Sequence, residues 1–154
     1  MKTSVLIIAA AFLFAGAACG QSAKDVPAGV ASAFAQKFPK ASKVEWGKET
    51  ETEWEAEFKM DGREYSANYD NAGTWMETEY GITVKEIPAI VKTTLDKEFA
   101  GYKIEESAIS ETKDGKVFEF VLEKDKTGME ASISPDGKVL SKKEVTEENE
   151  KDEK

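Results

Sequence analysis

The chain has 154 residues, and its 21 Lys and Arg against 30 Asp and Glu give a formal net charge of −9. It contains no histidine and a single cysteine, which excludes Ser-His and Cys-His nucleophile pairs, His-containing zinc or copper sites and thiolate metal sites. The acidic balance argues against a nucleic-acid partner, because phosphate binding requires a basic surface. The composition therefore favours an acidic binding domain over an enzyme, and it predicts neither a cofactor nor a metal.

Residues 1–18 have the pattern of a signal peptide. Lys2 is followed by a ten-residue apolar run, too short to span a membrane, and then by small residues. Two kinds of processing stay open at this point. Cys19 stands where a bacterial lipoprotein carries its lipidated first residue, although Gly16 replaces the usual Leu, and cleavage after Ala17 would release an unmodified chain.

Either kind of processing places the mature protein outside the cytoplasm, in the periplasm or cell envelope. It would be an outer-membrane lipoprotein or a secreted protein, and its contact with a membrane would run through a lipid anchor at Cys19. Removal of residues 1–18 deletes one cation and leaves 20 basic and 30 acidic residues, a net charge of −10. One cysteine cannot form an internal disulfide.

A polar leader, residues 19–25, precedes the first predicted helix. Val30, Phe34 and Phe38 recur every four residues, which is the spacing of one apolar stripe along a helix. Pro27 suits the first turn, because its missing N–H is not needed there, and Pro39 ends the helix.

Strict alternation then predicts strands. Trp54, Ala56, Phe58 and Met60 point to one side of a strand, and the acidic residues between them point to the other. Asp61-Gly62 is a strong signal for a two-residue hairpin. A second alternating run covers 65–69, and a turn at 71–73 leads into a further strand at 74–80.

The same order of elements recurs in the second half of the chain. Residues after Ile87-Pro88 repeat the helix with an offset of 61, and the strands after Trp54 repeat with an offset of 64. We therefore predict a tandem duplication, with repeats at 26–82 and 83–145, and a polar, acidic tail at 146–154 that is typical of disorder. The predicted fold class is α+β, each repeat being one helix and a four-stranded antiparallel sheet.

Several segments together resemble a known family. They are Phe38-Pro39-Lys40-Ala41, Lys43-Val44-Glu45-Trp46, Trp54-Glu55-Ala56-Glu57-Phe58, Asp61-Gly62-Arg63-Glu64-Tyr65 and Asp70-Asn71-Ala72-Gly73, with echoes at 129–133 and 135–140. Their order resembles the PepSY-like, beta-lactamase-inhibitor-like secreted proteins of Bacteroidetes-type bacteria. The resemblance implies one curved sheet with both helices on one face, and a non-catalytic protein that binds or inhibits another protein.

Two features are candidates for the binding site. The first is the row Glu53, Glu55 and Glu57, whose members lie about 6.6–7 Å apart along one strand face. A solvated face, a site for a cation or a basic partner, and the paired carboxylates of a hydrolase all remain open for this row. This spacing is shorter than the electrostatic screening length of about 8 Å, so neighbouring carboxylates repel unless something compensates them.

The second feature is an excess of aromatic residues in the first repeat, which holds nine of the 13 that follow the signal segment and all three tryptophans. Trp75 and Met76 are adjacent on a strand, so one of them is expected to face away from the helix, and Trp46 would join it if its strand carries a bulge. An exposed Trp is a typical anchor for a protein partner. We predict an envelope protein that binds a basic protein or peptide through its sheet face; the alternative is a periplasmic carrier of a small ligand or cation.

Overall fold

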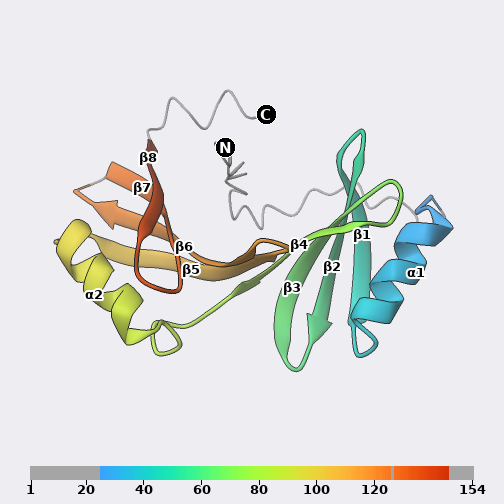
Figure 1. The fold of residues 1–154 in the computed structure, drawn as a ribbon, viewed down its shortest axis with the longest axis horizontal. Helices are drawn as coiled ribbons and strands as arrows, with labels where there is room; N and C mark the ends of the chain where they lie inside the picture. The colour runs from blue at the N-terminus through green and yellow to red at the C-terminus, as the bar shows by residue number, and fades with distance from the viewer. Residues whose placement is uncertain (1–24, 126, 146–154) are drawn as a thin grey trace.

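The computed structural model describes residues 25–125 and 127–145, which form two helices and eight strands (Figure 1). One helix and four strands are followed by a second helix and four more strands. The elements are α1 (Ala28–Lys37), β1 (Ser42–Thr50), β2 (Glu53–Met60), β3 (Arg63–Asp70), β4 (Trp75–Gly81), α2 (Ala89–Glu98), β5 (Lys103–Thr112), β6 (Gly115–Lys124), β7 (Thr127–Ile133) and β8 (Val139–Val145). The predicted α+β class with an antiparallel sheet is confirmed.

All eight strands form one open antiparallel sheet in the order of the chain, from β1 to β8. Short hairpins explain this order: between β2 and β3, Asp61 and Gly62 have φ angles of 52° and 82°, which suits a two-residue turn that matches the twist of its strands. The two halves of the sheet are joined where β4 pairs with β5, from Glu77 opposite Thr112 to Gly81 opposite Ala108.

The strand register shows that both helices cover the same face of the sheet. Ala67, which faces α1, lies opposite Thr78. Two residues further along β4, Tyr80 lies opposite Ile109, which in turn lies opposite Phe118 beneath α2. Directly opposed residues share a face, so these positions form one continuous side, which we call the helix face. The other side is the open face. Figure 1 shows α1 and α2 at the two ends of the molecule, with the twisted sheet between them.

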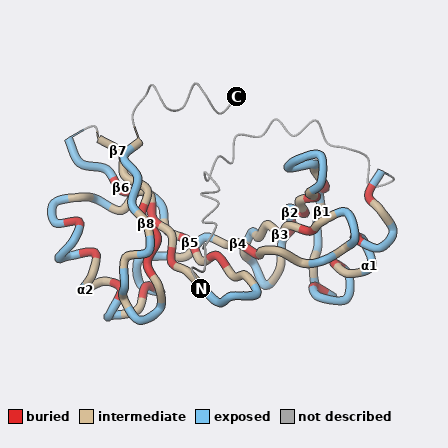
Figure 2. Tube along the Cα trace, turned by 45° about the horizontal axis from the view of Figure 1, so that its top comes forward, coloured by how far each residue is buried: buried red, intermediate tan, exposed pale blue. Residues whose placement is uncertain are grey.

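Two hydrophobic cores stabilise the two halves, and each lies between one helix and its strands (Figure 2). The first is aromatic: the Phe34 ring lies 5.0 Å from Phe58 and 5.2 Å from Trp46, between ring centroids. The second is mainly aliphatic, with Val91 and Leu95 of α2 against the strands. The excess of aromatic residues in the first half is therefore largely accounted for by its core.

A glycine turn holds each helix close to the sheet. Gly73, between β3 and β4, has a φ of 85°, and a Cβ at this position would lie 2.8 Å from the carbonyl oxygen of Gly29 in α1. Gly137, between β7 and β8, has a φ of 84°, and its Cβ would lie 2.9 Å from Ile90 Cγ1 in α2. Both turns need a residue without a side chain, because the backbone is left-handed and the helix is too near.

Candidate functional site

The open face carries a group of half-buried glutamates that extends across both halves of the sheet. Strand alternation and register place on this face Glu55 of β2, Glu77 and Glu79 of β4, Glu119 of β6 and Glu130 of β7, and we call these five residues the glutamate cluster. Asn68 lies between Glu55 and Glu77 in one row of the sheet. Neither α1 nor α2 covers these carboxyl groups.

The centre of the cluster is the pair Glu79 and Glu119, which lie on the two sides of β5. Glu79 belongs to the row of Ser110, and Glu119 lies opposite Ala108. Strands two places apart are separated by roughly 9–10 Å, and the small side chains on β5 leave room for the two glutamates between them.

The environment of the cluster opposes ionisation. Burial, reinforced by the charge of Glu119, raises the pKa of Glu79 to about 9. Burial is also the main cause that raises the pKa of Glu119, to about 7. Burial and the nearby Glu49 and Glu57 raise the pKa of Glu55 to about 7. Removing a carboxylate from water and placing like charges beside it both favour the neutral form.

Hydrogen bonding within the cluster is incomplete. The Ser110 hydroxyl donates to the Glu77 carboxylate, which partly offsets the effect of burial on the raised pKa of Glu77. In contrast, one oxygen of Glu79 (Oε1) and one of Glu130 (Oε2) are buried without a hydrogen-bond partner. Buried acceptors without donors are costly, so the open face offers oxygens that a donor from another molecule could satisfy.

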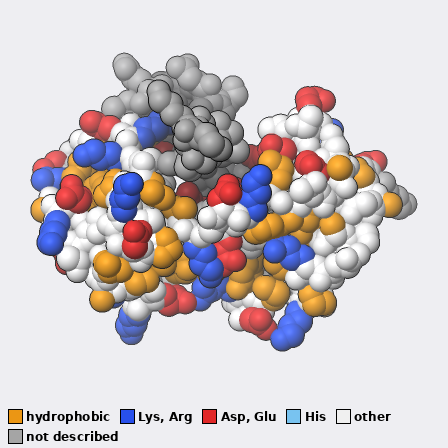
Figure 3. Space-filling model, in the orientation of Figure 1, with side chains coloured by type: hydrophobic (Ala, Val, Ile, Leu, Met, Phe, Trp, Pro, Cys, Tyr) orange, Lys and Arg blue, Asp and Glu red, His pale blue; other side chains and the backbone are white. Residues whose placement is uncertain are grey.

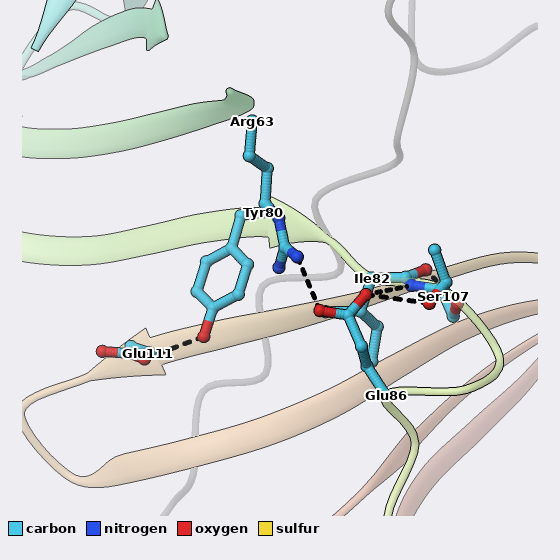
Figure 4. Close-up of polar contacts among 7 residues, drawn as sticks. Arg63, Tyr80, Ile82, Glu86, Ser107 and Glu111 are labelled. Atoms are coloured by element: carbon cyan, nitrogen blue, oxygen red, sulfur yellow. Dashed lines mark hydrogen bonds and ion pairs between the residues drawn. The ribbon is translucent and has the colours of Figure 1, made fainter. Parts of the chain in front are cut away.

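On the helix face, a second group of polar residues ties the two halves together (Figure 4). Arg63, at the start of β3, pairs with Glu86 in the connection between β4 and α2, with Nη2 and Oε1 2.6 Å apart. The Arg63 guanidinium lies 5.4 Å from the ring centre of Tyr80, whose hydroxyl donates to Glu111 of β5 over 3.2 Å. In the space-filling view, basic and acidic side chains are interspersed over the visible side of both halves (Figure 3).

The predicted glutamate row lies where the alternation puts it. Glu53, Glu55 and Glu57 follow one another on the open face of β2, and Glu57 is the most exposed of the three. Their role in binding a partner stays a prediction. Cys19 lies outside the described residues.

The expected position of the two tryptophans on the open face is wrong. Trp46 is buried in the first core, with 9% of its surface exposed. Trp75 is half-buried at the edge of the same core: Lys37 Nζ of α1 lies 3.6 Å from its ring centre, and Trp75 Nε1 donates to Thr78 Oγ1 over 2.8 Å. A role of either residue in partner binding remains untested, but Trp46 presents little surface for it.

A bulge accounts for the position of Trp75. Tyr69 pairs with Trp75 and Asn68 pairs with Glu77, so β4 has one residue more than β3 at this point. A bulge interrupts the period of two, and Trp75 and Thr78 consequently both lie on the helix face.

Four members of the cluster, Glu77, Glu79, Glu119 and Glu130, were not among the candidates from the sequence. A signal was present, because Glu77 and Glu79 alternate with Thr78 just as the glutamates of β2 alternate with apolar residues. The pairing of β4 with β5, which brings carboxylates from both halves together, has no such local signal.

Among the described residues, no group of three or more His, Cys, Asp or Glu side chains has the geometry to hold a metal ion. In the same part of the chain, no helix has the length and hydropathy needed to cross a membrane.

The fold and the open face define an α+β protein built on one meandering antiparallel sheet, with both helices on one side. The model of the family described as "Putative beta-lactamase-inhibitor-like, PepSY-like" matches residues 52–141, and the chain belongs to this family. The resemblance inferred from the sequence segments is thereby confirmed. A comparison with curated proteins gives no match.

Solved structures from Bacteroides species share the fold. A DUF2874 family protein from Bacteroides ovatus is 19% identical with a TM-score of 0.75, over 83% of this chain and 92% of its own. A BLIP-like protein from Bacteroides fragilis is 21% identical with a TM-score of 0.69, over 77% and 85%. A protein from Bacteroides eggerthii described as "putative periplasmic" is 19% identical with a TM-score of 0.72, over 79% and 90%.

Proposed function

We propose that this protein is a non-catalytic binding protein of the cell envelope, and that it holds a basic protein or peptide segment against its open face. The observation that carries the proposal is the glutamate cluster, in which five half-buried carboxyl groups from both halves gather on a face that neither helix covers. The family description and the BLIP-like relative support a protein partner, and the description also supports an inhibitory form of this binding.

Charge complementarity favours a basic partner. A surface of one sign attracts and orients a partner of the other sign. Lys or Arg side chains would donate to the buried oxygens of Glu79 and Glu130 that lack a partner and would offset the repulsion between the carboxylates. A neutral or acidic partner would leave both costs in place.

We also propose that the two halves, 26–82 and 83–145, arose by tandem duplication. Both helices have ten residues and follow a proline, and the residue after each helix, Phe38 or Phe99, donates its N–H to the residue four positions before. Residues 64 positions apart also match: the register shifts at Trp75 and Val139, and the close turns at Gly73 and Gly137, recur. Superposition of the halves should pair the strands at this offset; a best superposition that pairs them at another offset would refute the duplication.

The location in the envelope rests on the signal pattern of residues 1–18 and is supported by the periplasmic description of one similar structure. We propose a lipid anchor at Cys19, with residues 19–25 and 146–154 as leader and tail. Labelled palmitate should enter the wild-type protein and not the Cys19→Ser variant. Loss of the signal segment without label in the wild type would instead support plain secretion.

The binding proposal is tested by capture from envelope extract with matched charge changes. The mature protein and its Glu55→Lys/Glu57→Lys variant, changed on the open face, are compared with Asp96→Lys/Glu98→Lys, which makes the same change in charge on the exposed side of α2. We expect the open-face variant to lose a partner that the control retains, and the captured partner to elute as salt rises. Equal retention or equal loss in the two variants, with thermal melts showing both folded, would refute the proposal.

A further inference from the structure

The second core contains a half-open cavity at the end of α2, on the helix face and therefore away from the glutamate cluster. Its volume is about 210 Å³. The buried side chains of Leu95 and Phe99 of α2 and Leu122 of β6 form its floor, and the half-buried Tyr102 and Ile104 form its walls. Apart from the Tyr102 hydroxyl, these side chains carry no polar atom, so the cavity suits an apolar ligand.

In the first half of the protein, the corresponding position is filled by phenyl rings. Phe34, Phe38 and Phe58 form one cluster there: the ring centroid of Phe34 lies 5.4 Å from that of Phe38 and 5.0 Å from that of Phe58. The centroids of Phe38 and Phe58 lie 4.7 Å apart. At offsets of 61 and 64 in the sequence, the counterparts of these residues are Leu95, Phe99 and Leu122. Two of the three rings are thus replaced by smaller side chains, and the space that the rings would occupy is part of the cavity.

The backbone supports this correspondence and accounts for the mouth of the cavity. Residues 38–41 and 99–102 form the same turn, and in each the last N–H donates to the first carbonyl over 3.0 Å. Pro39-Lys40 in the first turn is replaced by Ala100-Gly101 in the second, which leaves the cavity open at this point. Lys124 lies across this pair, since its Nζ donates to the carbonyl of Ala100 over 3.4 Å. A lysine side chain is flexible, so it covers the mouth without sealing it.

We propose that this cavity binds a small uncharged molecule that contains one apolar six-membered ring. An apolar cavity of about 150 Å³ holds benzene, so the present volume of about 210 Å³ accommodates one ring with a short substituent. The rim favours neither sign of charge, because the exposed Asp96 and Lys124 are of opposite sign, and the floor cannot solvate an ion. The site shares no residue with the glutamate cluster, so it is independent of the proposed function.

The first test is an NMR titration of the mature protein, labelled with ¹³C in its methyl groups, with benzene as the probe. We expect saturable shifts at the methyl groups of Leu95, Ile104 and Leu122, and none at Val30 in the first core. Benzoate and benzylammonium should bind at least tenfold more weakly, because the floor cannot solvate their charge. The absence of saturable shifts at the three residues, or tighter binding of either ion than of benzene, would overturn the proposal.

The second test fills the cavity. Leu122→Phe restores the ring that the first half carries at Phe58 and should weaken benzene binding at least tenfold. The matched control, Leu140→Phe, makes the same change at an exposed residue of β8 and should leave the affinity unchanged.

Benzene should also raise the melting temperature of the wild type and of the control, but not that of Leu122→Phe, because a ligand stabilises only a fold that binds it. If Leu122→Phe does not fold, Leu95→Phe fills the cavity from the side of α2, and the wild-type titration decides the question if neither variant folds. Undiminished binding of benzene by a folded, filled variant would overturn the proposal.

Discussion

Tyr69 offers the sharpest test of how the first core is built. Its side chain has no exposed surface, and its hydroxyl group has no hydrogen-bond partner. The ring itself is well packed, with centroids 6.3 Å from Phe34 and 6.5 Å from Trp46. Burial raises the pKa of this hydroxyl to about 12, because the charged form would not be solvated in the core. The ring therefore stabilises the core while the hydroxyl destabilises it.

The Tyr69→Phe variant separates these two contributions, because it keeps the ring and removes the hydroxyl. A buried polar group without a partner costs about 1–3 kcal/mol. We therefore expect the free energy of unfolding to increase by about 1 kcal/mol or more. For a domain of this size that corresponds to a rise of roughly 3–6 °C in the melting temperature.

The measurement is urea unfolding followed by tryptophan fluorescence, with thermal melts alongside. Tyr80→Phe is the matched control, because its hydroxyl donates to Glu111 and its removal should lower stability by up to about 1 kcal/mol. If Tyr69→Phe lowered stability as much as Tyr80→Phe, the Tyr69 hydroxyl would have a partner, such as a buried water, and the reasoning would be refuted.

Further predictions concern packing, the close turns and pH. In thermal melts, Phe34→Ala should lower the free energy of unfolding by about 3–5 kcal/mol. Trp75→Ala should lower it by less than that, but by more than a change at an exposed residue, because Trp75 packs at the edge of the core. Equal losses in the two variants would make Trp75 a full core residue. Gly73→Ala should lower stability by more than Gly62→Ala: both have a positive φ, but a Cβ meets the α1 backbone at Gly73 and nothing within 4 Å at Gly62. Because its pKa is raised in the fold, protonated Glu79 contributes stability that is fully present below the ordinary glutamate pKa and is lost as pH rises towards about 9. The free energy of unfolding should therefore fall across that window in the wild type, and less steeply in Glu79→Gln. A stability that is flat or rising over this range would contradict the last expectation.

Much of the fold could be predicted from local patterns. The two helices follow from apolar residues spaced by four after Pro27 and Pro88, and the hairpin at Asp61-Gly62 follows from turn chemistry. The family assignment also followed from the order of such segments. These signals are local in the sequence, so they are present before any tertiary contact is known.

The position of Trp75 could not be predicted in the same way. Alternation assigns a face to each residue only while the strand is regular, and the extra residue of β4 opposite β3 changes the assignment for every position beyond it. The residues at the bulge, Trp75, Met76 and Glu77, include no proline or glycine that would indicate it. The adjacency of Trp75 and Met76 indicated that one of them faces away from the helix, but it could not show which, and the structure places Trp75 on the helix face.

The glutamate cluster shows why the site belongs to the whole sheet and to neither half. The carboxyl groups of Glu55, Glu77 and Glu79 come from the first half, and those of Glu119 and Glu130 come from the second. They meet because β4 pairs with β5, and because Ala108 and Ser110 keep the space above β5 free. A single helix-and-four-strand unit would hold only part of the cluster, three carboxyl groups in the first half and two in the second. Joining two units places one carboxyl from each on either side of a strand of small residues, where burial opposes ionisation of both. The complete cluster, and with it the proposed binding surface, is thus a product of the junction, because no local pattern in the sequence indicates that β4 pairs with β5.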